Sequence, residues 1–153
     1  MAQDVGDCLA SFHSEMLVSQ PLAGLRVLIL EDEFLIAMDV EQLCRDNGAA
    51  DVIILRRLED YQPPVDGGFD VAIVDVMLDG TPTLDFAREL QDRGTPFVFA
   101  SGYTDSEEIR RAFPEVSLIG KPYAGDDLIA AVALAAGRSG QTDWLDVRRP
   151  PSP

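Results

Sequence analysis

The sequence is poor in basic residues and has no long apolar run. Its 153 residues include 12 Lys and Arg against 27 Asp and Glu, a formal net charge of −15. This balance disfavours nucleic acid and anionic membrane surfaces as direct partners. No uninterrupted apolar segment is long enough to span a bilayer, and no basic stretch precedes an apolar core near residue 1. We therefore expect a cytoplasmic protein that binds neither nucleic acid nor membrane.

Cysteine is also scarce, since only Cys8 and Cys44 are present. Cys44 lies on an apolar face with a helical period, which favours a buried small hydrophobic residue over a disulfide half or a metal ligand. The other members of that face are Ile36, Val40 and Leu43.

The chain does contain a regular alternation of apolar runs and helical segments. The expected strands lie near residues 25–30, 51–55, 69–75, 96–100 and 116–119. The expected helices lie near residues 34–47, 57–62, 82–93, 104–113 and 125–137. Thr81-Pro82 supplies the expected N-cap and first-turn proline of the third helix. With right-handed crossovers, this order predicts an α/β fold with a doubly wound parallel sheet of five strands and helices on both faces.

Carboxylates stand at the ends of two expected strands. Glu31 and Asp32 follow the first strand, and Asp75 ends the third. Because the carboxyl ends of parallel strands meet at one edge, these side chains should lie together. Two carboxylates ~4 Å apart repel by roughly 4 kcal/mol at a dielectric of about 20, so a cation is expected among them. Oxygen ligands point to Mg²⁺ or a similar hard ion.

Two further groups reach the same edge. Ser101 follows the fourth strand and Lys121 follows the fifth. Carboxylates for a metal, a nucleophilic carboxylate, a hydroxyl and an ammonium are the groups needed to accept and hold a phosphoryl group. Asp75 is the expected acceptor. Taken singly, Asp32 or Glu33 could instead serve the first turn of the following helix.

In this order the residues resemble the active site of the receiver domains of two-component response regulators, and the match runs from about Arg26 to Ala136. The matching positions are Glu31, Asp32, Asp75, Ser101 and Lys121-Pro122. More narrowly, residues 96–103, Pro-Phe-Val-Phe-Ala-Ser-Gly-Tyr, resemble the signature of the single-domain FAT GUY receivers. Ser101 stands where that signature has Thr, and it keeps the hydroxyl.

The resemblance implies a flavodoxin-like strand order 2-1-3-4-5. It also implies transfer of a phosphoryl group to Asp75 from a histidine kinase or a histidine phosphotransfer protein. Lys121 would then pair with the acyl phosphate, and the hydroxyl of Ser101 would bond one of its oxygens. The implied Mg²⁺ ligands are Glu31, Asp32, Asp75 and the backbone carbonyl of Met77.

Three more positions are expected to modulate the site. In the resembled family, the residues two after the acceptor and two after the hydroxyl affect the access of water to the phosphoryl group. Here these residues are Met77 and Tyr103. An apolar side chain and a ring at these positions could shield the phosphoryl group and slow its hydrolysis. Most receivers carry Tyr or Phe three residues before the lysine; here Leu118 has no ring, which puts the usual aromatic switch in doubt.

We expect three parts: an N-terminal extension over residues 1–24, a receiver domain over 25–137 and a flexible tail over 138–153. The extension has a weak amphipathic pattern that is compatible with a helix. We expect a phosphoacceptor signalling domain and not an enzyme, one that acts on a downstream protein through contacts or serves as a phosphate shuttle or sink. The alternative is a degenerate receiver that serves as a phosphorylation-independent binding module.

Overall fold

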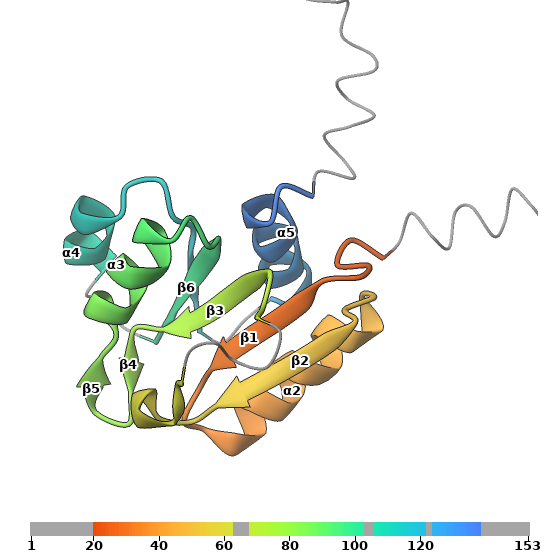
Figure 1. Ribbon diagram of the computed structural model, residues 1–153, viewed down its shortest axis with the longest axis horizontal. Coiled ribbons are helices and arrows are strands. Elements are labelled where there is room, and N and C mark those ends of the chain that lie inside the picture. Colours follow the sequence, from red (N-terminus) through yellow and green to blue (C-terminus); the bar gives the residue numbers. More distant parts are fainter. Residues whose placement is uncertain (1–19, 63–67, 103–105, 122–123, 139–153) are drawn as a thin grey trace, which may run out of the picture.

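The parallel sheet is built from short apolar strands, as the sequence predicts. The computed structural model describes residues 20–62, 68–102, 106–121 and 124–138. Its main sheet has the order β2-β1-β3-β6-β7, and every neighbouring pair is parallel (Figure 1). The strands are β1 (Arg26–Leu30), β2 (Asp51–Leu55), β3 (Val71–Asp75), β6 (Phe97–Ser101) and β7 (Leu118–Gly120). This is the predicted order 2-1-3-4-5, because a small hairpin accounts for the labels β4 and β5.

Helices cover both faces of this sheet (Figure 1). Helices α2 and α5 pack on one face, while α3 and α4 lie on the other. The helices are α2 (Phe34–Asp46), α3 (Leu84–Asp92), α4 (Ser106–Ala112) and α5 (Gly125–Ala135), with one 3₁₀ turn, η1 (Leu58–Asp60). Within the described ranges, none of these helices is long and apolar enough to cross a membrane.

Alternation along β1 shows how the strands build two cores. Val27 and Ile29 join the core under α2 and α5, whereas Leu28 and Leu30 join the core under α3 and α4. Successive side chains of a strand point to opposite faces, so a strand buried on both faces is apolar throughout. The apolar run that the sequence displays is therefore a consequence of having two helical layers.

Three phenylalanine rings anchor the layer beside β6. Phe97 and Phe99 come from that strand, and Phe113 follows α4. Their rings meet edge to face, with centroids 5.2 Å apart for Phe99 and Phe113 and 5.9 Å apart for Phe97 and Phe113. Such contacts add to the free energy gained from burial. Ile109, within α4, is buried in the same core.

The start of the third helix was predicted wrongly. Thr81-Pro82 forms the strand β5 (Thr81–Pro82), which pairs antiparallel with β4 (Met77–Leu78), so neither residue caps or begins α3. The intervening Asp79 and Gly80 have φ of 52° and 78°. Two residues with positive φ give the tight hairpin turn that suits the twist of the paired strands. Helix α3 begins two residues after this hairpin, at Leu84.

The remaining bounds agree with the expectations to within about two residues, except that the second helix is reduced to the single turn η1. Cys44 is fully buried, as expected, and burial raises the pKa of its thiol to about 12. The chain before β1 also contributes to the core, because Leu22 is fully buried and its N–H donates to the carbonyl of Asn47. The predictions for residues 1–19, Tyr103 and residues 139–153 lie outside the described residues.

Candidate functional site

The register of the sheet brings the predicted side chains to one edge. Leu30 of β1 pairs with Val74 of β3, so the residues that come next, Glu31 and Asp75, lie side by side. On the other side of β3, Asp75 pairs with Ala100. Parallel strands thus deliver their carboxyl ends to a common edge, as the sequence predicts.

Ser101 and Lys121 reach the same edge through the next two strands. Ser101 ends β6 and pairs with Gly120 of β7, and Lys121 follows directly. The backbone N–H of Lys121 donates to the carbonyl of Ser101 at 2.8 Å, which fixes the start of the loop after β7. Ser101 is buried and comes directly after Ala100, the residue that pairs with Asp75.

The Lys121 ammonium joins the two buried carboxylates. Its Nζ lies 2.6 Å from Oε1 of Glu31 and 2.8 Å from Oδ2 of Asp75. Residues Glu31 and Asp75 are 2% and 6% exposed. Three ionisable groups from three strand ends therefore share one small volume, where each charge interacts strongly with the others.

Burial sets the protonation behaviour of this trio. It raises the pKa of Glu31 from the ordinary 4.5 to about 7, with a smaller contribution from the charge of Asp75, while hydrogen bonds from Lys121 and from the N–H of Glu33 oppose the rise. Burial disfavours the Lys121 ammonium, but the hydrogen bonds and charges of Asp75 and Glu31 outweigh it, so the pKa of Lys121 is raised above 10.5. Lys121 thus stays charged at neutral pH, whereas Glu31 changes its charge near pH 7.

A buried threonine that the sequence did not reveal holds the backbone after β3. The hydroxyl oxygen of Thr83 lies 2.6 Å from the carbonyl oxygen of Asp75 and 3.0 Å from that of Val76. Thr83 is fully buried, and its own N–H donates to the Val76 carbonyl. The Asp75 carboxylate also accepts a long hydrogen bond of 3.4 Å at Oδ1 from the N–H of Met77. Asp75 is therefore held through both its backbone and its side chain.

Glu31, Asp32 and Asp75 could hold a metal ion. Each offers a carboxylate oxygen, and these oxygens all lie within 4.8 Å of one another. Asp32 is only partly buried, so the cluster opens toward solvent on its side. A donor set made only of oxygens fits a hard cation such as Mg²⁺. Lys121 already contacts two of the three carboxylates, so an incoming cation would compete with it for them.

Two of the three positions expected to modulate the site, Met77 and Leu118, lie within the described residues. The Met77 side chain is 43% exposed in β4, and Pro82, opposite it, has no N–H to donate to the Met77 carbonyl. Leu118 is half-buried in β7 and packs against the core under α4. Tyr103 lies outside the described residues.

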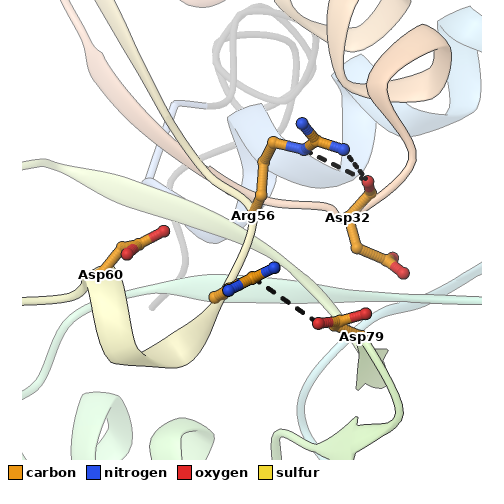
Figure 2. Close-up of a pocket in the computed structure, with 5 residues that line it drawn as sticks. Asp32, Arg56, Asp60 and Asp79 are labelled. Carbon is orange, nitrogen blue, oxygen red and sulfur yellow. Dashed lines mark hydrogen bonds and ion pairs between the residues drawn. The ribbon is translucent and has the colours of Figure 1, made fainter.

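Two arginines beside the cluster were missed by sequence reasoning. They follow β2 and line a polar cavity of about 360 Å³, together with Asp32, Asp60 and Asp79 (Figure 2). Arg56 donates to the backbone carbonyl of Asp32, and Arg57 forms an ion pair with Asp79, with Nε 3.7 Å from Oδ2. The rule that brought the acidic residues together also applies here, because both arginines follow the carboxyl end of a parallel strand.

No family model matches the chain. In sequence, the chain is similar to the transcriptional regulatory protein PdtaR of Mycobacterium tuberculosis, with 31% identity over 122 residues. The match covers 74% of this chain and 57% of that protein, so the chain spans little more than half the length of this curated relative.

Several solved structures share the fold. The N-terminal signal receiver domain of a two-component response regulator from Bacteroides fragilis has a TM-score of 0.64 at 22% identity, covering 74% of this chain and 97% of that chain. A receiver protein from Burkholderia phymatum has a TM-score of 0.60 at 19% identity, covering 75% and 97%. A PhyR variant from Bartonella quintana, described as an anti-anti-sigma factor, has a TM-score of 0.65 at 26% identity, covering 90% and 57%. These likenesses give the fold; the narrower FAT GUY resemblance stays a prediction.

Proposed function

We propose that this chain, which has the fold of a response regulator receiver domain, accepts a phosphoryl group on Asp75 and signals through protein contacts. The observation that carries the proposal is the contact of one ammonium, Lys121, with two buried carboxylates, Glu31 and Asp75. A buried trio of this kind is unfavourable as a mere structural element, because each charge loses its hydration. Its position at the carboxyl edge of a parallel sheet favours a functional role.

In the proposed reaction, a carboxylate oxygen of Asp75 attacks the phosphorus of a phosphohistidine donor. The new O–P bond forms as the N–P bond to the imidazole breaks, and the imidazole leaves. Lys121, 2.8 Å from Oδ2, lies where its charge can offset the negative charge that arrives with the phosphoryl group. Ser101, at the end of the neighbouring strand, is the hydroxyl proposed to bond a phosphoryl oxygen.

The acidic cluster is the proposed Mg²⁺ site. When bound, Mg²⁺ would neutralise and orient the phosphoryl oxygens during transfer. The oxygens that lie within 4.8 Å of one another support this choice of ligands. The proposed ligands are Glu31, Asp32, Asp75 and the backbone carbonyl of Met77.

The proposed phosphoryl donor is a histidine kinase or a histidine phosphotransfer protein, and the proposed location is the cytoplasm. The domain would act as a phosphoacceptor in signalling and not as an enzyme that releases a product. PdtaR is described as a transcriptional regulatory protein and PhyR as an anti-anti-sigma factor, so similar chains act within larger regulatory proteins. For this chain we propose output through a downstream protein, or use as a phosphate shuttle or sink.

The test is incubation with acetyl phosphate and Mg²⁺, followed by intact mass measurement. The wild type should gain the mass of one phosphoryl group, and Asp75→Asn should gain none. Asp79→Asn is the matched control, because it changes an exposed carboxylate in the adjacent hairpin turn and should label like the wild type. A wild type that stays unmodified would favour the degenerate receiver, and full labelling of Asp75→Asn would refute the choice of acceptor.

A further inference from the structure

Arg56 holds the backbone of a proposed metal ligand. It directly follows β2, and its guanidinium reaches across to the loop after β1 (Figure 2). Nη2 lies 3.1 Å and Nε lies 3.4 Å from the carbonyl oxygen of Asp32. The same guanidinium lies over the ring of Phe34, with its central carbon 6.0 Å from the ring centroid. The Arg56 side chain thus contacts both Asp32 and Phe34, the residues on either side of Glu33.

Of the three acidic residues, Asp32 is the one whose side chain is held least by its neighbours. Glu31 and Asp75 are buried, and the Lys121 ammonium holds their carboxylates. The Asp32 carboxylate is only partly buried, and it makes no hydrogen bond or ion pair with any other described residue. No side chain among the described residues therefore holds that carboxylate, and Arg56 bonds to the backbone that carries it.

Arg57 provides a comparison within the same cavity. It carries the same charge and lines the same cavity, but it pairs with the side chain of Asp79, and both partners are more than 60% exposed. Removal of either arginine takes one positive charge from the neighbourhood of the acidic cluster. Only removal of Arg56 also frees the carbonyl of Asp32.

We propose that Arg56 is a positioning residue for the metal site, acting through the backbone of Asp32. The inference rests on the proposed function, because it concerns the same acidic cluster. The sign of the effect separates positioning from simple electrostatics. A nearby positive charge weakens the binding of a cation, so an arginine that acts only by its charge would, when removed, strengthen Mg²⁺ binding. An arginine that positions Asp32 would, when removed, weaken it.

The test is titration of the metal-free protein with Mg²⁺, followed by isothermal calorimetry, for the wild type, Arg56→Ala and Arg57→Ala. Arg56→Ala should raise the dissociation constant about tenfold, which is the usual effect of removing a group that orients a metal ligand. Arg57→Ala should leave the constant unchanged or lower it. Arg56→Lys should behave like Arg56→Ala, because an ammonium keeps the charge but loses the planar fork that spans the carbonyl.

Phosphorylation by acetyl phosphate gives a second readout. In Arg56→Ala, the Mg²⁺ concentration that gives half the maximal rate should rise by the same factor as the dissociation constant, while the rate at saturating Mg²⁺ stays near that of the wild type. Equal affinities in Arg56→Ala and Arg57→Ala would overturn the positioning role and leave the proposed function standing. A wild type that binds no Mg²⁺ would overturn both.

Discussion

Replacing Glu31 by glutamine removes a carboxylate whose ionisation the fold disfavours. Burial is the main reason that the pKa of Glu31 rises from 4.5 to about 7, and the charge of Asp75 adds to it. Glutamine has nearly the same shape and can still accept hydrogen bonds from Lys121 and from the N–H of Glu33, but it carries no charge. The difference in unfolding free energy between variant and wild type therefore reports the cost of the buried charge.

The sign follows from proton binding. Because the folded state holds the Glu31 proton more tightly than the unfolded chain, the stabilisation from that proton is complete below pH 4.5 and is lost as the pH rises to about 7. A pKa difference of about 2.5 corresponds to about 3 kcal/mol. Glu31→Gln does not titrate, so its stability relative to the wild type should be about 2–3 kcal/mol higher at about pH 8 than at about pH 5.

Urea unfolding of the metal-free proteins, followed by far-ultraviolet circular dichroism at both pH values, measures this difference. Glu33→Gln is the matched control, because it removes an exposed carboxylate from the same loop and should show no change of this size. Added Mg²⁺ should reverse the order, since a ligand that binds only the folded wild type stabilises it. Identical pH dependence in Glu31→Gln and the wild type would refute the assignment of this ionisation to Glu31.

Three further changes test other parts of the site. Lys121→Ala should still let some acyl phosphate form on Asp75 but should lose the spectral changes that beryllofluoride causes in the wild type; unchanged spectra would show that Lys121 does not report the new charge. Thr83→Val keeps the shape of the side chain but removes the hydroxyl that donates to the carbonyls of Asp75 and Val76, so the free energy of urea unfolding should fall by about 1–3 kcal/mol; a change near zero would contradict the anchoring of the β3 end. Met77→Asn and Tyr103→Ala should release phosphate faster than the wild type if these side chains shield it, and equal release rates in both variants would refute shielding.

The sheet and the acidic cluster were predictable because they depend on patterns that extend over several residues. Short, mainly apolar runs marked the buried strands, and the rule for parallel sheets then placed Glu31, Asp75, Ser101 and Lys121 at one edge. No pattern, however, predicted that Lys121 would contact both Glu31 and Asp75. That contact depends on side-chain reach and on the loop after β7, which only the folded chain defines.

The hairpin β4–β5 was missed although its signal was present. Asp-Gly is the strongest two-residue hairpin turn, but the strands that flank Asp79-Gly80 are only two residues long. Thr81-Pro82 also matches the start of a helix, and that competing pattern decided the prediction. The position of Arg56 after β2 could have been inferred from the same strand-end rule, but its contact could not, since its partner is the carbonyl of Asp32 and a backbone acceptor leaves no mark in the sequence.

The aromatic anchor of α4 has a mechanical consequence. Ile109 in the middle of this short helix and Phe113 directly after it are buried, while Glu107 and Glu108 near its start are exposed. A helix that is packed more firmly toward one end tilts about that part when its support moves, so its other end is displaced most. Here the pivot lies against Phe99 in the strand that ends at Ser101. A small displacement of that strand end would therefore be magnified at Glu107 and Glu108, which are exposed on the surface of the domain.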